Sequence, residues 1–216
     1  MQVQHLANIE ILVPTLMSAA NCRVCEIKDK GEIDMKILFI DTETGGLNAE
    51  KHSLLTVAFA VYNNGEIVAE KEFAVKHKYY LVSTKALEVN NINLIEHDQI
   101  AIESKVVVQE IIKFIKDNFG DEKPVIAGHN IEFDYKFLDK LFQNEKEYWW
   151  KYVSHRKLDT CSLINFLMVT GKIEIESASL EASINYFKIE TNARHTAKDD
   201  VRATIALFEN INKLFN

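Results

Sequence analysis

The sequence predicts an α/β domain, and three observations indicate this class. Residues 37–40 are apolar, include a β-branched type and run directly into charged residues, which is typical of a strand covered on both faces. Residues 54–62 and 67–75 alternate between apolar and polar types around the tight-turn sequence Asn63-Asn64-Gly65, which predicts a β-hairpin. From residue 107 onward, apolar residues recur with helical spacing.

The middle of the chain predicts one clear helix and one further strand. Residues 84–103 are polar with scattered apolar residues, so we expect one short helix and a loop there. Apolar residues between 107 and 115 then form a helical face that ends near Gly120. Residues 124–128 predict a short buried strand that begins with a proline.

The next helix is predicted to begin at Asn130, which is a favourable N-cap residue. Its apolar stripe contains Phe137, Leu138 and Leu141, and Asp134 lies on the same stripe. An unpaired charge at that position would cost several kcal/mol or lose its ionisation. Asp134 is therefore a candidate for a functional role.

Two helices, at about 160–170 and 179–187, precede the last one. Thr196 and Asp199 form a capping box at the start of the last helix. Asp200 leads a row of residues that should face the core: Thr204, Leu207, Ile211 and Leu214. His195 lies just before the helix, where burial and the positive helix end favour its neutral form.

Composition indicates one domain with an N-terminal extension. The chain has 216 residues, of which 47% are hydrophobic, enough for a sizeable core. Residues 1–34 show neither helical nor strand periodicity, and we expect them to be disordered or not native. Lys30-Gly31-Glu32 can be encoded by a ribosome-binding sequence just before Met35, so we expect the natural protein to begin at Met35 and the domain to span 35–216.

Cysteine usage and hydropathy predict a cytoplasmic protein without a membrane partner. Cys22, Cys25 and Cys161 cannot form a disulfide framework and fit a reducing compartment. Cys22 and Cys25 make at most half of a zinc site, so we expect no structural zinc. No apolar run has the length of a membrane span, and no Lys or Arg precedes Arg23 to form the basic start of a signal peptide.

The acidic residues suggest a metal site. Asp41 and Glu43 follow the first buried strand two residues apart, so their side chains leave the same face of the sheet. Neighbouring carboxylates raise each other's pKa unless a cation lies between them. Acidic pairs commonly only solvate a strand end, but Asp134 and Asp200 also sit where an unpaired charge is unfavourable. Four such carboxylates can hold two Mg²⁺ ions about 3.5 to 4 Å apart, the geometry of two-metal phosphoryl transfer.

The formal net charge of -7 argues against a protein that holds nucleic acid by a broad basic surface. It does not exclude an enzyme that binds phosphates through metal ions.

Three motifs carry a family resemblance. Asp41-Thr42-Glu43-Thr44-Gly45-Gly46, then Gly128-His129-Asn130-x-x-Phe133-Asp134, then His195-x-x-x-x-Asp200 resemble the exonuclease motifs of the DEDDh (DnaQ-like) 3′ to 5′ exonucleases. The resemblance spans about residues 36–215. It implies a ribonuclease H-like fold, with a mixed five-stranded sheet flanked by helices, and two Mg²⁺ ions as cofactors, with Mn²⁺ as an alternative.

The resemblance also implies a role for each motif residue. Asp41 would bridge both metals, Glu43 and Asp200 would complete the first, and Asp134 would support the second largely through water. His195 would be the general base that takes a proton from the attacking water. A packing role for His195 at the helix start remains the alternative.

The implied substrate is a single-stranded 3′ end of DNA or RNA, from which nucleoside 5′-monophosphates are released. Leu47 could wedge against the terminal base, and Lys198 and Arg202 lie around the site, where they can touch phosphates, although a solvated helix face explains Lys198 equally well. The residues expected to contact the substrate are Thr42, Thr44, Gly45, Gly46, Leu47, His129, Asn130, Phe133 and Arg194.

Several alternatives stay open at this point. A non-catalytic nucleic-acid-binding or scaffold module on the same fold is the main one, although such a module gains nothing from keeping four carboxylates and His195. Proofreading with a DNA polymerase as partner, DNA repair and RNA trimming all use the same motifs in this family. The sequence does not separate them, nor does it indicate an oligomeric state.

Overall fold

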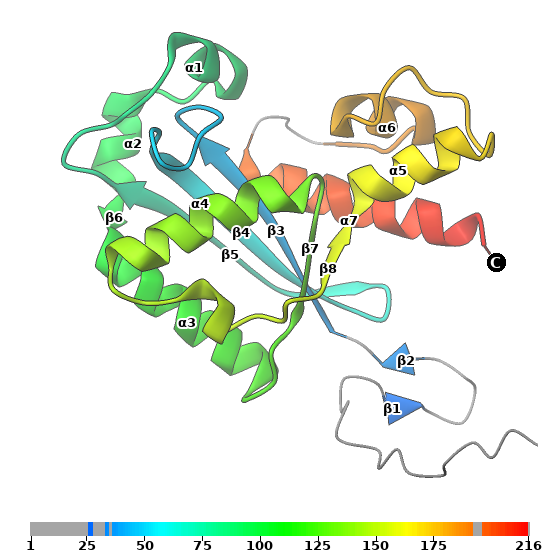
Figure 1. Cartoon of the computed structure of the whole chain (residues 1–216), viewed down its shortest axis with the longest axis horizontal. Coiled ribbons are helices and arrows are strands. Elements are labelled where there is room, and N and C mark those ends of the chain that lie inside the picture. Colours follow the sequence, from blue (N-terminus) through cyan, green and yellow to red (C-terminus); the bar gives the residue numbers. More distant parts are fainter. Residues whose placement is uncertain (1–25, 28–32, 35, 192–195, 216) are drawn as a thin grey trace, which may run out of the picture.

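A computed structural model describes residues 26–27, 33–34, 36–191 and 196–215 (Figure 1). Most of the predicted extension, and Met35, lie outside the described residues. Two short strands from that part, β1 (Glu26–Ile27) and β2 (Ile33–Asp34), pair antiparallel with each other. The predicted start at Met35 stays a prediction.

The domain is built on a six-stranded mixed sheet flanked by helices, which confirms the predicted α/β class. β3 (Ile37–Thr44) lies at its centre, antiparallel to β4 and parallel to β7. The strand order is β6 (Ile102–Glu103), β5 (Glu66–Lys76), β4 (Leu54–Asn63), β3, β7 (Val125–Gly128) and β8 (Lys157–Asp159). The predicted β-hairpin and both predicted buried strands are confirmed.

The sheet has six strands where five were expected, because the two-residue β6 pairs with the end of β5. Residues 84–103 also form two helices, α1 (Thr84–Asn90) and α2 (Leu94–Ile100), and not one helix and a loop. Each begins at a side-chain N-cap, Ser83 and Asn93. Helices of two turns bury few residues, so their apolar periodicity is too weak to detect in the sequence.

The helices form a layer on each face of the sheet (Figure 1). α3 (Ser104–Phe119) and α4 (Ile131–Asn144) pack on one face, together with the buried Trp149 of the short helix η1 (Trp149–Lys151). α7 (Ala197–Lys213) packs on the other face, and α5 (Thr160–Val169) and α6 (Leu180–Phe187) pack against α7. No helix in the described part of the chain is long and apolar enough to cross a membrane.

Alternation along β3 assigns its residues to the two layers. Leu38 and Ile40 belong to the core under α3 and α4, and Ile37 and Phe39 belong to the core under α7. All four are essentially inaccessible to solvent. β3 is therefore covered on both faces, as its apolar run predicted.

Small side chains let α7 lie close to the sheet. Ala58, Ala60 and Ala127 of the sheet meet Ala197, Val201 and Ile205 of α7. The predicted core row of this helix is only partly right. Leu207 and Ile211 are buried against α5 and α6, whereas Leu214 is 51% exposed near the end of the chain.

Candidate active site

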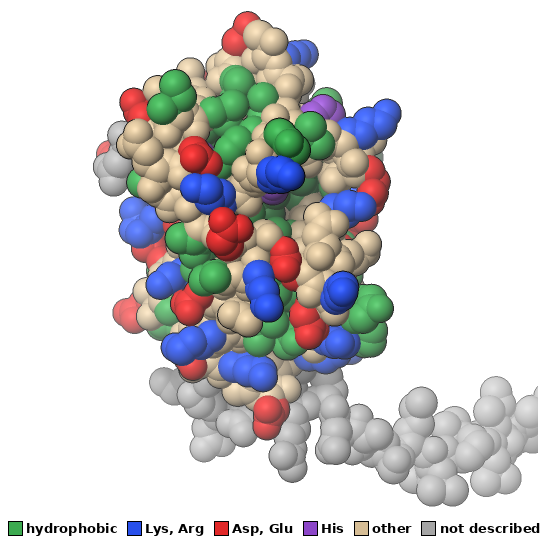
Figure 2. All heavy atoms as spheres, turned by 90° about the vertical axis from the view of Figure 1, so that its left-hand side faces the viewer, with side chains coloured by type: hydrophobic (Ala, Val, Ile, Leu, Met, Phe, Trp, Pro, Cys, Tyr) green, Lys and Arg blue, Asp and Glu red, His purple; other side chains and the backbone are tan. Residues whose placement is uncertain are grey.

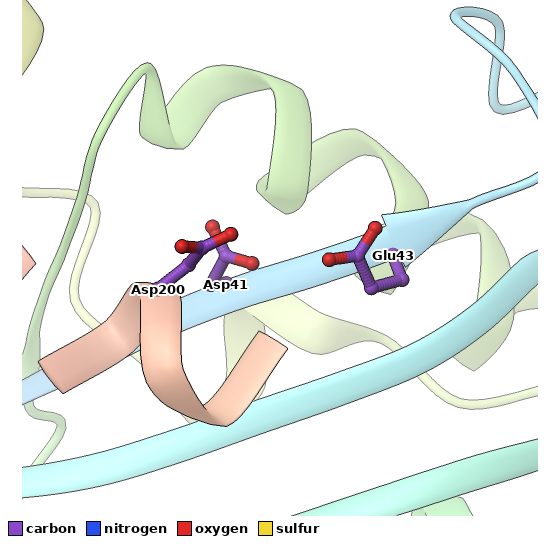
Figure 3. A group of neighbouring side chains, drawn as sticks. All are labelled: Asp41, Glu43 and Asp200. Atoms are coloured by element: carbon purple, nitrogen blue, oxygen red, sulfur yellow. The ribbon is translucent and has the colours of Figure 1, made fainter. Parts of the chain in front are cut away.

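Asp41 and Glu43 lie where β3 extends beyond its parallel neighbour. β3 pairs with β7 from Ile37 as far as Phe39, so among the described residues no strand pairs with its acidic end on that side. Two-residue alternation from Phe39 directs both carboxylates toward the layer of α7 (Figure 3). The predicted common face of Asp41 and Glu43 is confirmed.

Asp200 joins these carboxylates from the first turn of α7. Thr196 caps the helix by accepting a hydrogen bond of 3.1 Å from the backbone N–H of Asp199, so the predicted N-cap is confirmed. One carboxylate oxygen from each of Asp41, Glu43 and Asp200 lies within 4.8 Å of the other two. Figure 3 shows the three side chains pointing toward one another from β3 and α7.

Asp134 approaches from the other layer. It lies in the first turn of α4 and is only 3% exposed. The hydroxyl of Thr42, whose side chain leaves the opposite face of β3 from Asp41, donates a hydrogen bond of 2.7 Å to Asp134 Oδ1. Asp134 is thus outside the group of three, but its charge still raises the pKa of Asp41 and of Glu43.

The pKa values of three site carboxylates are raised, which means that their surroundings disfavour the ionised forms. Burial raises the pKa of Asp41 well above its usual value, and the charges of Asp134, Asp200 and Glu43 raise it further. Burial, followed by the charges of Asp200 and Asp134, raises the pKa of Glu43 to about 8. Burial raises the pKa of Asp134 to about 7 despite its hydrogen bond from Thr42.

A divalent cation fits this donor set. Carboxylate oxygens from two elements converge on one point, and hard cations such as Mg²⁺ and Mn²⁺ prefer oxygen ligands. A bound cation would replace the protons that burial and mutual repulsion otherwise favour.

The start of α4 is where the sequence predicted it, but the reason is different. Asn130 makes no side-chain cap and adopts a left-handed conformation with φ 63° and ψ 44°. Its backbone N–H donates a hydrogen bond of 2.7 Å to Asp159 Oδ1. Asparagine suits this position because it tolerates the left-handed region better than most residues.

His129 is bonded inside the protein through both ring nitrogens. Nε2 donates to the carbonyl of Ala178 at 2.7 Å, and Nδ1 lies 2.9 Å from the hydroxyl of Thr160. Burial lowers the pKa of His129, which favours the neutral ring. His129 therefore ties the end of β7 to α5 and to the segment before α6.

The two glycines after Glu43 allow segments of the protein itself to pack closely. A Cβ atom on Gly45 would lie 2.3 Å from the carbonyl oxygen of Leu81, and one on Gly46 would lie 2.6 Å from the His52 ring. Gly45 also donates to the Ser53 carbonyl, and its own carbonyl accepts a hydrogen bond of 2.7 Å. This packing accounts for Gly45 without reference to a ligand.

A cavity of about 550 Å³ opens beside Glu43. Leu47 at its rim is 88% exposed, and Phe133 in its wall packs on Phe137 with ring centroids 5.0 Å apart. The cavity is lined by Thr42, Glu43, Thr44, Gly46, Leu47, His52, Ser83, Lys85, Ala86, Val89, Asn90 and Phe133.

Half of the residues that line this cavity were not predicted from the sequence; His52 is one of them. Ser83, Lys85, Ala86, Val89 and Asn90 come from α1 and its cap, a segment without a legible pattern. The buried Asn90 side chain donates a hydrogen bond of 3.2 Å to the Thr44 carbonyl, which fastens α1 to the end of β3. Arg194 and His195, both predicted site residues, lie outside the described residues.

The face that carries α1, α2 and β6 has no single charge character (Figure 2). Basic and acidic side chains are interspersed over it, and hydrophobic side chains gather in its upper part. Val89 and Leu81, near the cavity, are 61% and 55% exposed. This face therefore carries no broad basic patch.

The sequence profile of the RNase_T exonuclease family matches residues 38–208. The chain belongs to this exonuclease family. The match covers all three motifs and confirms the resemblance to DnaQ-like exonucleases.

Curated relatives at low identity include proteins of DNA and of RNA metabolism. The chain is 28% identical to the DNA polymerase III subunit epsilon of Aquifex aeolicus over 177 residues, covering 82% of this chain and 80% of that protein. It is 24% identical to ribonuclease T of Buchnera aphidicola over 178 residues, covering 78% of each. It also matches a PolC-type DNA polymerase III of Thermotoga maritima at 25% identity, but over only 12% of that protein.

Among solved structures, E. coli exonuclease I in complex with a dT13 oligonucleotide is similar, with a TM-score of 0.72 at 19% sequence identity. The alignment covers 83% of this chain and 42% of exonuclease I, so this chain spans less than half of that protein. The likeness confirms the ribonuclease H-like exonuclease fold.

We expect Glu43→Gln to stabilise the metal-free protein at alkaline pH. The pKa of Glu43 is raised from 4.5 to about 8, so the folded protein binds this proton more tightly than the unfolded chain does, and stability falls as pH rises between these values. Allowing for partial exposure, the variant should gain on the order of 2 kcal/mol above pH 8, or roughly 4–8 °C in Tm, and little near pH 4.5.

Thermal unfolding in EDTA across this pH range measures the effect. Glu88→Gln, at an exposed position of α1, is the matched control and should follow the wild type. Identical pH profiles for the wild type and Glu43→Gln would show that the carboxylates do not destabilise the metal-free site.

Proposed function

We propose that this protein is a metal-dependent 3′ to 5′ exonuclease that removes nucleoside 5′-monophosphates from single-stranded ends. The observation that carries the proposal is the convergence of Asp41, Glu43 and Asp200 within 4.8 Å, beside a cavity with apolar walls. Family membership supports a nuclease, and the geometry supports a metal-assisted attack on a phosphodiester at the edge of that cavity.

The carboxylates would hold the metal ions. Asp41, Glu43 and Asp200 would bind a first Mg²⁺, and Asp41 and Asp134 a second, with Mn²⁺ as an alternative. When bound, the two ions would stabilise the charge on the attacking and leaving oxygens. Thr42 orients the Asp134 carboxylate through its hydrogen bond, so it acts on this half of the site without being a ligand.

The cavity beside Glu43 would take the terminal nucleotide. Leu47 at the rim and Phe133 in the wall offer apolar surfaces for the base. Thr44 and Gly46 would contact the nucleotide, and Lys85 would offer a cation for a phosphate. Gly45, His129 and Asn130 would contribute by fixing the surrounding segments, and Arg194 would contact a phosphate, as the resemblance implies.

His195 would act as the general base. This role rests on the motif spacing to Asp200, and the packing alternative is tested below. A scaffold without catalysis is the second candidate function. It is disfavoured by the raised pKa values of the cluster, because a scaffold would keep a destabilising group of carboxylates with no use for it.

DNA and RNA both remain substrates in this proposal, since relatives named for each are similarly distant. Association with a DNA polymerase is proposed on the same basis, from the epsilon and PolC relatives. A cytoplasmic site of action is proposed from the cysteine usage.

The direct test uses matched DNA and RNA single strands labelled at the 5′ end. We expect a ladder of labelled fragments that shorten from the 3′ end in Mg²⁺ or Mn²⁺, no products in EDTA, and recovery when metal is restored. Asp41→Asn should lower the rate by about a thousandfold or more because it removes a carboxylate that would bind both ions. Immediate release of labelled mononucleotide would instead mean 5′ to 3′ degradation, and full activity in EDTA would exclude the metal site.

Leu47→Ala should weaken binding of the terminal base. Removing an apolar side chain that packs on a base costs about 1–2 kcal/mol, so KM should rise roughly five- to thirtyfold with a smaller change in kcat. Val169→Ala is the matched control, because Val169 on α5 is also 88% exposed but does not line the cavity. Equal KM values for the two variants would show that the terminal base does not bind in this cavity.

His195→Ala should lower single-turnover hydrolysis by about a hundredfold or more while affinity for metal and for a single-stranded 3′ end persists. The wild-type rate should fall as pH drops through the histidine pKa, because a base must be neutral to accept a proton. Asp200→Ala should weaken metal binding as well. If His195→Ala keeps wild-type turnover from about pH 6 to about pH 9, His195 has only a packing role.

A further inference from the structure

The position of Asp200 depends on how α7 is held on the sheet. The interface under its first turns combines short side chains, including Ala58, Ala60 and Ala197, with larger buried ones such as Phe39 and Val201. One carboxylate oxygen of Asp200 lies within 4.8 Å of an oxygen of Asp41 and of Glu43, so ionised forms of these side chains repel one another when no cation is present. Polar contacts at the start of α7 add to this apolar packing and oppose the repulsion.

Glu70 of β5 supplies such a contact. Its carboxylate accepts two hydrogen bonds from Arg202, Nε to Oε1 and Nη2 to Oε2, each of 2.7 Å. This paired geometry fixes orientation as well as distance. The Lys198 ammonium lies 3.5 Å from the same carboxylate. In the sequence, Asp200 therefore lies between Lys198 and Arg202, which both contact Glu70.

Glu72, two residues further along β5, adds a backbone contact. Its Oε1 accepts a hydrogen bond of 3.1 Å from the backbone N–H of Lys198, one of the N–H groups that the first turn of a helix leaves without a partner. Glu70 and Glu72 of β5 thus contact both the backbone and the side chains of the first two turns of α7. The sequence analysis placed Lys198 and Arg202 where they could touch phosphates. In the structure both side chains contact Glu70.

We propose that Glu70 is a positioning residue that, through Arg202, holds the Asp200 carboxylate in place for metal binding. The inference rests on the proposed metal-dependent function. The Glu70 side chain is 18% exposed and that of Arg202 is 45% exposed, so solvent partly screens the pair. Its effect is on the geometry of Asp200, which lies two residues from Arg202.

Arg202→Gln separates positioning from simple electrostatics. Removing a positive charge near a cation site should strengthen metal binding if charge alone matters. Loss of the paired contact should instead weaken it by about tenfold, as is typical when a group that orients a ligand is removed. Glu70→Gln should also weaken binding, and Arg202→Lys, which keeps the charge but not the planar fork, should fall between the wild type and Arg202→Gln.

The measurement is Mn²⁺ affinity by calorimetry and electron paramagnetic resonance on the full chain without nucleic acid, with Tm in EDTA as a check of folding. Glu66→Gln on the same strand and Arg156→Gln before β8 are matched controls and should bind as the wild type does. Tighter or unchanged binding by Arg202→Gln, with normal Tm, would overturn the positioning role. Failure of the wild type itself to bind Mn²⁺ would instead overturn the proposed metal-dependent function.

Discussion

Repulsion among closely spaced, partly buried carboxylates is the constraint on which the site depends. Asp41 and Glu43 lie close to Asp200 because β3 extends beyond the last residue paired with β7. The packing of α7 on the sheet brings Asp200 to them. The surrounding structure meets the cost of this arrangement with apolar layers on both faces of β3. A divalent cation is the natural counterpart of such a cluster.

The sequence was most informative where local pattern and burial coincide. The apolar run before Asp41, the hairpin turn at Asn63 to Gly65 and the cap at Thr196 each depend on neighbouring residues alone, and each is confirmed. Asp134 was also recognisable, since a charge on an apolar helix stripe is conspicuous. The three motifs then led to the family that the profile match confirms.

Other features arise only from contacts between distant segments. The wall of the cavity comes from α1, which Asn90 fastens to Thr44 across 46 positions of sequence. β8 is three residues long and β6 only two, so neither has room for a visible alternation. The engagement of Arg202 by Glu70 joins residues 132 positions apart, and nothing in the local sequence of either indicates it.

The separation of the acidic residues by the backbone of β3 has a consequence for how the protein would fail under stress. Asp200 is carried by the α7 layer, whereas Asp134 belongs to the α4 layer and is bonded to Thr42. Fraying of one layer would therefore disable one half of the site before the other. If the proposed two-ion site is present, heat or denaturant would then leave a species that still binds one ion but does not turn over substrate, and metal retention alone would not report an intact enzyme.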